Sequence, residues 1–433
     1  IVDNYIIHKS KKTQAWLKQN PKFTLLFQPV YYPLVNKIEK LWHALHETGT
    51  RNHRWTEIWE LIQRVRRFIV SSSPFLGNQH GMARVKQNLD QLLRLKGTFV
   101  HQSVSGIALL LGALIISAML SRLMIPLAHR YRLLDIPCNR KQHNGSIPLV
   151  GGISIFITTA VMLLGFISTE EGARLFVVAS ALMVFIGVLD DKHDLSVRLR
   201  IVAQLLVALI IVFGAETYIT NLGNLVGLGD IKLGVWGIPF TLLAIMAAMN
   251  AYNMVDGIDG LLGGLSFISF AAIAFLGYAH GNDFVHTTSM IIAAALIPFI
   301  ARNTSFPFKN VRKVFMGDAG SMFIGLAIVW LLTLVTQPSL QTNESTPVRP
   351  VIVLWFIAVP LMDMLAIMFR RAAKGQSPFK PDRNHLHHIF MRAGFTSREA
   401  LLFILSIALI KALLGIALEL FYVADWIVLS LYV

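Results

Sequence analysis

The sequence predicts an all-α polytopic membrane protein with about 10–11 transmembrane helices, preceded by a small helical segment that does not span the membrane. Of the 433 residues, 55% are hydrophobic and 15% are charged, and the mean hydropathy is +0.59. Soluble domains carry about 25% charged residues. Apolar runs of about 20 residues, the length that crosses a bilayer, recur from residue 104 onwards. An ordinary soluble protein is therefore excluded.

The apolar runs place the predicted spans in chain order. They are expected at 104–124, 147–167, 173–189, 200–214, 235–252, 261–280, 286–302, 320–336, 350–369, 399–418 and 419–433. Residues 1–100 contain no run of this kind, so the chain is expected to divide into residues 1–100 and a multi-pass domain at 101–433.

The first hundred residues are basic and aromatic. Residues 57–69 have the spacing of an amphipathic helix with a basic face, which fits either a solvated surface or a nucleic-acid contact. The stretch 27–45 resembles the C-terminal end of DDE-type insertion-sequence transposases, with Glu39 at the position of the last metal-binding carboxylate. The other two carboxylates of that family precede this stretch, so we expect a catalytically inactive remnant and no nucleic-acid partner for the membrane domain.

The loops between the predicted spans alternate in charge. Lys and Arg gather in the loops near 130–141, 192–198, 302–313 and 370–398, whereas the loops at 168–172, 215–234, 281–285 and 337–349 contain few. Basic residues accumulate in cytoplasmic loops. The first set is therefore expected on the cytoplasmic face, and all the polar motifs of the chain fall in that set.

Three acidic motifs lie at the ends of these spans. Asp190 and Asp191 end one apolar run, Asp256 and Asp259 follow Asn253 in a glycine-rich stretch, and Asp318 stands between glycines before another run. Helix caps or a charge cluster at the headgroups explain each motif alone. Carboxylates from several loops on one side suit Mg²⁺ or Mn²⁺ completed by phosphates.

Basic motifs accompany the acids. Lys141 precedes a Gly-Gly helix start, and Arg383 is followed by His385, His387 and His388. Phosphate binding competes here with a positive-inside anchor for Lys141 and with a solvated surface for the histidines. Zinc is disfavoured because no cysteine is near and the acidic loops suit a harder cation. Acids for a cation and bases for phosphate indicate phosphoryl transfer involving a lipid.

These motifs resemble a known family. The AspAsp pair near 190, AsnMetValAspGlyIleAspGly at 253–260, PheMetGlyAspAlaGlySer at 315–321 and ProAspArgAsnHisLeuHisHis at 381–388 are similar, in this order, to the polyprenyl-phosphate N-acetylhexosamine-1-phosphate transferases. The resemblance covers about residues 105–433. It is closest to bacterial members that make undecaprenyl-diphospho-GlcNAc and UMP from UDP-GlcNAc and undecaprenyl phosphate at the start of O-antigen and enterobacterial common antigen synthesis.

The resemblance implies a role for each motif. Mg²⁺, with Mn²⁺ as an alternative, is expected on Asp318 and Asp191, and Asp190 and Asp191 are expected to orient or deprotonate the lipid phosphate. Asn253, Asp256 and Asp259 are expected to line the nucleotide and metal pocket. Lys141, Arg383, His385, His387 and His388 are expected to bind phosphate charge at the cytoplasmic face of the bacterial inner membrane.

Three questions stay open at this level. A muramoyl-pentapeptide donor would use the same chemistry, because no residue in the sequence defines the sugar. A secondary transporter also carries carboxylates in its membrane domain, although its site lies near the bilayer midplane and these acids lie at helix ends. A homodimer is compatible with the sequence but not indicated by it.

Overall fold

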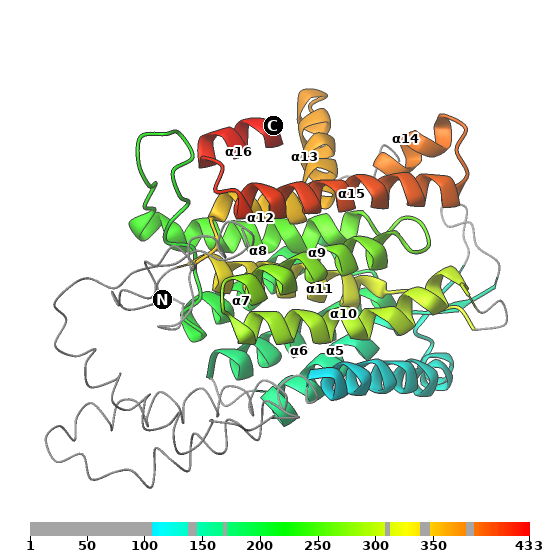
Figure 1. Ribbon diagram of the computed structural model, residues 1–433. Coiled ribbons are helices and arrows are strands. Elements are labelled where there is room, and N and C mark those ends of the chain that lie inside the picture. The colour runs from blue at the N-terminus through cyan, green and yellow to red at the C-terminus, as the bar shows by residue number, and fades with distance from the viewer. Residues whose placement is uncertain (1–105, 137–144, 168–170, 308–311, 338–346, 378–384) are drawn as a thin grey trace, which may run out of the picture. The chain divides into compact units, whose positions relative to one another are not determined.

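The computed structural model describes residues 106–136, 145–167, 171–307, 312–337, 347–377 and 385–433, all within the compact unit Gln102–Val433. Membrane-length helices run side by side in this part of the chain (Figure 1). Residues 1–105, with the transposase-like stretch and Glu39, lie outside the described residues, as do Lys141 and Arg383. The predictions made for them stay predictions.

The helices follow one another through short connections. An unlabelled helix, Gly106–Tyr131, comes first. Two short antiparallel strands follow, β1 (Leu134–Asp135) and β2 (Ile147–Pro148). The remaining elements are α5 (Gly151–Met162) with η3 (Leu163–Ile167), α6 (Glu171–His193), α7 (Val197–Leu209) with η4 (Ile210–Gly214), η5 (Gly234–Trp236), α8 (Gly237–Met254), α9 (Leu261–Ala279), α10 (Asp283–Thr304), α11 (Gly317–Thr336), α12 (Pro350–Phe356), α13 (Ala358–Ala373), α14 (Leu386–Arg392), α15 (Ser397–Leu420) and α16 (Asp425–Tyr432).

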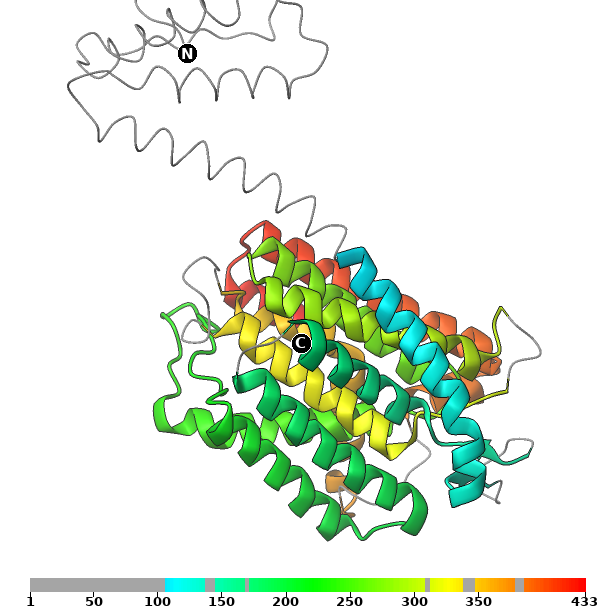
Figure 2. The ribbon, with the colours of Figure 1, turned by 90° about the horizontal axis from the view of Figure 1, so that it is seen from below.

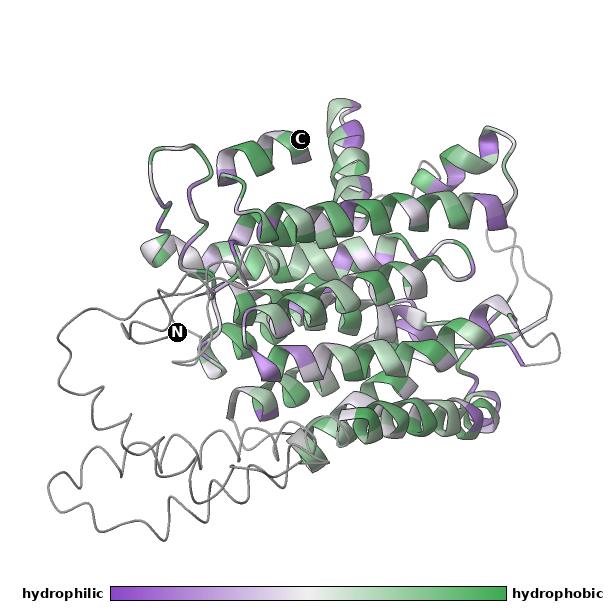
Figure 3. Ribbon diagram, viewed as in Figure 1, coloured by the Kyte–Doolittle hydropathy of each residue, from purple (hydrophilic) through white to green (hydrophobic). Residues whose placement is uncertain are grey.

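The predicted all-α membrane fold is confirmed. In the described residues, eight helices are long and apolar enough to cross a membrane, and the bent pair α12–α13 makes a ninth if counted as one span. In Figure 3 the helices are mostly green, the colour of apolar residues, and the purple, polar segments lie mainly towards the helix ends. Exposed Ile107, Leu111 and Ile115 recur every four residues on the first helix, as a lipid-facing stripe does.

Two predicted spans differ from the prediction in detail. The run 147–167 contains a strand and then a shorter apolar helix, Gly151–Phe166. The run 419–433 contains only the last residues of α15 and the eight-residue α16. At 1.5 Å per residue, a helix of that length covers about 12 Å, less than half of a bilayer core. Hydropathy alone could not show that the chain turns at 421–424.

Helix α11 occupies the centre of the bundle. All of its residues except Asp318 and Leu334 are buried, and it packs against α5, α6, α8 and α9. Figure 2 shows this helix, in yellow, enclosed by the others. Its sequence is apolar on every face, which is the pattern of a fully buried helix. The helices α5, α6, α8 and α9 therefore surround α11, and residues at the ends of these helices lie near the ends of α11.

Small residues bring the neighbouring helices close to α11. A Cβ atom on Gly152 of α5 would overlap the backbone of Gly320, and one on Gly187 of α6 would overlap the backbone of Ala319. A Cβ on Gly325 would meet the backbone of α8 at Met249, 2.6 Å away. Small residues allow such close helix packing in membranes, where apolar side chains gain little by leaving lipid. These contacts fix where α6 and α8 end relative to the start of α11.

The helices α12 and α13 meet at a bend of 83°, and in Figure 1 α13 runs across the direction of α15 and projects beyond it. Pro360 causes the break, because its nitrogen has no hydrogen to donate to the carbonyl of Phe356. The Ser269 hydroxyl donates to that carbonyl instead, at 2.7 Å, and lies 2.7 Å from the Tyr252 hydroxyl. The freed backbone group is thus satisfied within the protein, as it must be at membrane depth.

We call the end of the bundle at which α6 and α8 end and α11 begins the motif end, and the opposite end the far end. At the far end, Arg349 donates to Glu419 at 2.7 Å and to Asp425 at 3.2 Å. His280 lies 3.4 Å from Glu419, and the backbone N–H of Asn224 donates to Asp425 at 2.9 Å. This buried network joins the 215–234 loop, the start of α12 and the last two helices.

Candidate active site

The site at the motif end begins with a contact between α6 and α11. Asp191, near the end of α6, accepts hydrogen bonds from the backbone N–H groups of Asp318 at 2.8 Å and Ala319 at 3.3 Å. Gly317 precedes them with φ of +75°, and its Cβ position is taken by the Asp191 carboxylate. A carboxylate at a helix N-terminus satisfies free N–H groups and complements the helix dipole. Asp191 therefore fixes the first turn of α11.

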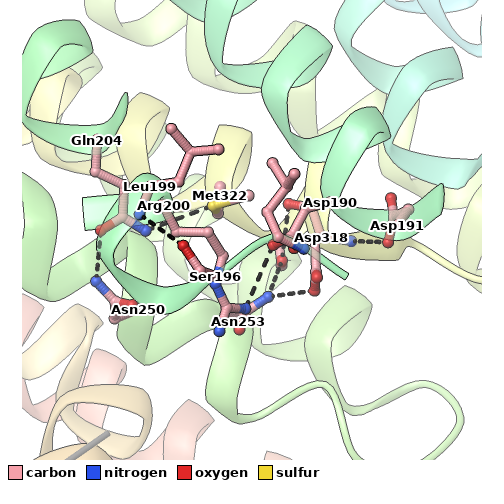
Figure 4. Close-up of polar contacts among 12 residues, drawn as sticks. Asp190, Asp191, Ser196, Leu199, Arg200, Gln204, Asn250, Asn253, Asp318 and Met322 are labelled. Atoms are coloured by element: carbon pink, nitrogen blue, oxygen red, sulfur yellow. Dashed lines mark hydrogen bonds and ion pairs between the residues drawn. The ribbon is translucent and has the colours of Figure 1, made fainter. Parts of the chain in front are cut away.

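The second contact brings together the side chains of three helices (Figure 4). The Asn253 amide, at the end of α8, donates to Asp318 Oδ1 at 2.7 Å and to Ser321 Oγ at 2.9 Å. The carboxyl of Asp190 interacts with that of Asp318. Three of the sequence-predicted residues thus meet at one place. Two adjacent carboxylates repel one another unless a cation or a proton is shared between them.

Arg200 and the backbone hold Asp190 in place. The side chain of Asp190 is buried, with Arg200 Nη1 3.3 Å from Oδ2 and the Leu195 N–H 2.8 Å from Oδ1. Arg200 comes from the first turns of α7, which Ser196 caps by accepting from the Leu199 N–H. The sequence analysis placed Arg200 at the start of the predicted span 200–214 and missed the pair. The ten-residue separation of Asp190 and Arg200 spans a turn between two helices, so helix periodicity could not reveal it.

The glycine-rich stretch after α8 carries two exposed aspartates. Asp256 and Asp259 are exposed, and Asp259 forms an ion pair with Lys313. Gly260 has φ of +83°, and its N–H donates to Asn303 Oδ1 at 2.6 Å. The stretch is a tight turn that connects the end of α8 to the start of α9. Asp256 and Asp259 therefore lie at the solvent side of the motif end.

The histidines join the same end from α14. The His387 ring lies where a Cβ on Gly257 would be, so this glycine makes room for the imidazole. The rings of His385 and His387 are stacked with centroids 5.8 Å apart, and those of His387 and His388 are 4.2 Å apart. Burial, followed by the neighbouring His388 and His385, lowers the pKa of His387 to about 4, although Asp363 opposes the shift. His387 is therefore neutral at physiological pH.

Two further polar contacts were not predicted from the sequence. Asp363, on α13, accepts from His385 Nδ1 at 3.0 Å and from the Leu386 N–H at 2.9 Å. Gln204 of α7 accepts from Asn250 of α8 at 2.8 Å, one turn deeper in the membrane than Asn253. An acid inside an apolar run was the available signal for Asp363, since intramembrane carboxylates are functional candidates.

The donor set can be compared with what a divalent cation needs. Within the described residues, no group of three or more His, Cys, Asp and Glu side chains is gathered closely enough to hold a metal by itself. Mg²⁺ commonly uses only one or two protein carboxylates and completes its shell with water and substrate phosphates. Asp190 and Asp318 supply two such carboxylates. Their oxygen donors and mutual repulsion fit a hard divalent cation.

The fold and the site define a class, a polytopic membrane enzyme whose acidic site lies at one end of the helix bundle. Residues 173–336 match glycosyl transferase family 4. The chain is 44% identical over 304 residues to the undecaprenyl-phosphate α-N-acetylglucosaminyl 1-phosphate transferase of Yersinia pestis, covering 69% of this chain and 81% of that protein. It is 42% identical to the Haemophilus influenzae protein of that name, covering 70% and 84%, and 43% identical to the Escherichia coli K12 protein, covering 70% and 82%.

The chain belongs to this family of sugar-1-phosphate transferases. The matches cover more than four fifths of each of these relatives, so the likeness extends over nearly the whole membrane domain. The resemblance drawn from the four sequence motifs is thereby confirmed.

Proposed function

We propose that this protein transfers N-acetylglucosamine 1-phosphate from UDP-GlcNAc to undecaprenyl phosphate, giving undecaprenyl-diphospho-GlcNAc and UMP. The observation that carries the proposal is the meeting of Asp190, Asp318 and Asn253 at the motif end, in a chain more than 40% identical to transferases named for this acceptor and sugar. A lipid acceptor and a water-soluble donor can meet only near the membrane surface, which is where helix ends lie.

The bond changes define what the site must do. An oxygen of the lipid phosphate attacks the β-phosphorus of the donor, and the bond from that phosphorus to the bridging oxygen breaks, so UMP leaves with the electron pair. Phosphate monoesters have a second pKa near 6, so the attacking oxygen is largely ionised at pH 7. Positioning and charge neutralisation therefore contribute more than proton removal.

Each carboxylate then has a distinct task. Asp190, held by Arg200 and the Leu195 N–H, orients the acceptor phosphate and accepts its remaining proton. A divalent cation, Mg²⁺ or Mn²⁺, would be held by Asp318 with Asp190 and would neutralise the charge of the donor diphosphate. Both oxygens of Asp191 accept from the backbone N–H groups that begin α11, so we assign to Asp191 the placement of Asp318.

The residues around the buried carboxylates are proposed to bind the donor, UDP-GlcNAc. His385, His388 and, from the loops outside the described residues, Arg383 and Lys141 are proposed to bind diphosphate oxygens. His387 is neutral and packed on Gly257, so it supports the ring stack and does not add charge. Asp256 and Asp259 are proposed to border the nucleotide at the solvent side. The site is proposed to lie on the cytoplasmic face of the inner membrane, which the basic loops of the motif end support.

The experiment is an assay of the purified protein in detergent with undecaprenyl phosphate, labelled UDP-GlcNAc and Mg²⁺. We expect lipid-linked label and an equal amount of released UMP, both abolished by EDTA and restored by excess Mg²⁺. UDP-MurNAc-pentapeptide serves as the competing donor. Turnover of that donor alone would overturn the sugar assignment. Movement of unmodified substrate across proteoliposomes without UMP release would favour a transporter.

A further inference from the structure

Two arginines at the motif end lie close together without an acid between them. Arg302 is in the last turn of α10 and is 8% exposed, and Arg122, on the first helix, is near enough for its charge to act on that of Arg302. Among the described residues neither arginine forms an ion pair, and Arg302 makes one hydrogen bond, from Nη1 to the carbonyl of Arg312 at 3.4 Å. Like charges repel one another, and an anion bound between them would remove the repulsion.

Buried contacts between the first helix and α10 place the two arginines side by side. The hydroxyl of Ser117 donates to the carbonyl of Ala295 at 2.7 Å, and a small buried apolar cluster lies between the same helices. Both helices run towards the motif end. Arg122 and Arg302 each follow the Ser117–Ala295 contact by between one and two helical turns, so they come to a similar level.

Arg122 stands on the side of the first helix that faces lipid. Leu111, Ile115 and Met119 are exposed and recur every four residues, which is the spacing of one helix face. Arg122 is exposed and follows Met119 by three residues, so it continues this stripe at its motif-end side. A lipid whose acyl chains lie along the stripe would bring its headgroup to Arg122.

The length of α10 places the pair at the level of the headgroups. Asp283 starts this helix at the far end, and about 29 Å of helix separates it from Arg302, close to the thickness of the hydrocarbon core. The stem of Arg302 is buried, yet no nitrogen of its guanidinium is among the buried and unpartnered atoms of the described residues, so the charged end reaches the surface. A phosphate at the membrane surface can therefore approach both arginines.

A simpler interpretation is that the two arginines only anchor the helix ends. Basic residues accumulate on the cytoplasmic side, and a cation in the last turn of a helix complements the helix dipole. An anchor of this kind needs one exposed charge, and it does not explain why Arg302 is largely buried beside a second cation. The forked N–H groups of arginine bind phosphate oxygens in pairs, so two neighbouring arginines suit a phosphate.

We propose that Arg122 and Arg302 bind the phosphate of an anionic phospholipid from the leaflet at the motif end, with its acyl chains along the exposed stripe of the first helix. The lipid is neither the donor nor the acceptor of the transfer reaction, so the inference goes beyond the proposed function. A zwitterionic headgroup would bring a third cation to the pair, and an anionic lipid is therefore favoured. Phosphatidylglycerol represents this class.

The first test compares two phospholipids on the wild-type protein. The protein, purified in detergent and freed of lipid, is melted alone, with phosphatidylglycerol and with phosphatidylcholine of the same acyl chains. We expect phosphatidylglycerol to raise the melting temperature by about 2–4 °C, the shift for a ligand at about ten times its Kd, and phosphatidylcholine to raise it much less. Equal shifts from the two lipids overturn the proposal.

The second test removes each cation in turn. In the absence of lipid, Arg302→Gln should melt at or above the temperature of wild type, because the repulsion from Arg122 is gone, and it should lose most of the shift caused by phosphatidylglycerol. A role confined to the bond with Arg312 predicts the reverse, a lower melting temperature and an intact shift. Arg122→Gln, at an exposed position, should lose the same shift and covers the case in which Arg302→Gln does not fold. A wild-type shift in the folded variants overturns the proposal.

Arg398→Gln is the matched control. Arg398 is an exposed arginine in the first turn of α15, which begins at the motif end, where Leu401 lies beside Gly260. This variant should keep the full shift, and its loss there as well would mean that phosphatidylglycerol acts through general surface charge, against the proposal.

Two further ligands identify the source of the phosphate. Inorganic phosphate, compared with chloride at equal ionic strength, should give no shift, and a shift as large as that from phosphatidylglycerol would assign the pair to a free anion. A shift that undecaprenyl phosphate alone produces, and that Arg302→Gln abolishes, would assign the pair to the acceptor. Either result overturns the phospholipid assignment.

Discussion

The two ends of the helix bundle use buried carboxylates to opposite effect. At the far end, Glu419 and Asp425, 2% and 9% exposed, share the guanidinium of Arg349, and His280 lies beside Glu419. At the motif end, three carboxylates from α6 and α11 converge, and among the described residues Arg200 is the cation paired with them. The far-end group is close to balanced, whereas this group of described carboxylates at the motif end has an excess of negative charge.

The difference separates stability from function. A buried ion pair that is complete contributes little by itself, but removing one partner leaves an uncompensated charge and is strongly destabilising. An excess of one charge lowers stability until a ligand of the other sign binds. Substitutions in the far-end network should therefore lower the melting temperature and leave turnover unchanged. Substitutions of the motif-end carboxylates should lower turnover and leave the melting temperature unchanged or higher.

The largest effect is expected for Asp318→Asn at the motif end. The variant keeps the size of the side chain and loses the charge that would hold a divalent cation, so we expect turnover to fall by about 100-fold or more. The melting temperature in EDTA should hold or rise, because like-charge repulsion with Asp190 is removed. The measurement is steady-state UMP release beside thermal melting.

Asp283→Asn is the control for that experiment. Asp283 is also an acid in the first turn of a membrane helix, α10, but it lies exposed at the far end. Its loss should leave UMP release within about twofold of wild type. Retained turnover in Asp318→Asn would remove Asp318 from the site.

The next effect is expected for Gly152→Ala, which tests whether close packing around α11 places the site. The new methyl group would overlap backbone atoms of Gly320, and backbone cannot move aside as a flexible side chain can. Overpacking of this kind costs about 1–3 kcal/mol of stability. We expect a lower melting temperature together with a several-fold loss of kcat, because α11 carries Asp318.

Gly165→Ala provides the comparison for Gly152→Ala, since nothing lies within 4 Å of the added Cβ. That variant should match wild type in both measurements. A Gly152→Ala variant with a lower melting temperature than wild type, but with the wild-type kcat when assayed below that temperature, would show that helix spacing and catalysis are independent.

A smaller effect on turnover is expected for Arg349→Met at the far end. Glu419 and Asp425 would lose their guanidinium, and breaking a buried pair costs about 3–5 kcal/mol. We expect a clear fall in melting temperature and, below that temperature, kcat and KM within about twofold of wild type. Arg198→Met, at an exposed position, should change neither. A large loss of kcat/KM in a folded Arg349→Met would break the separation of the two ends.

The smallest effect concerns the pH dependence of stability. The pKa of His387 is lowered to about 4 by burial and by His388 and His385, against the opposing Asp363. Between pH 6.5 and pH 4 the unfolded chain thus binds a proton that the folded chain refuses, so stability falls as the pH falls through this range. His387→Asn should flatten that slope, whereas His129→Asn, at an exposed site, should not. An unchanged slope would contradict the burial of a neutral His387.

The sequence predicted those site residues that stand in motifs at the ends of apolar runs. It did not predict the contacts that join residues of two different elements. Asp190, Asn253 and Asp318 were expected together because each ends or begins an apolar run on the same side of the membrane. The Arg200 and Asp363 contacts were missed, because each joins two elements across a turn or loop that leaves no periodic signal. The turn after α15 and the bend at Pro360 were missed because hydropathy measures how apolar a run is and not where it changes direction.

The long chain separation within the site also has a consequence for how the protein is made. The bond between Asp191 and the Asp318 N–H joins residues 127 positions apart, with four spans between them. Chains are inserted from the N-terminus as they are synthesised, so Asp191 of α6 lacks the backbone N–H groups that it accepts from until α11 enters. A nascent chain that ends before α11 cannot bring Asp190 and Asp318 together. Catalytic competence thus arises late in synthesis, and ribosome stalling before α11 would leave an inserted but inert chain.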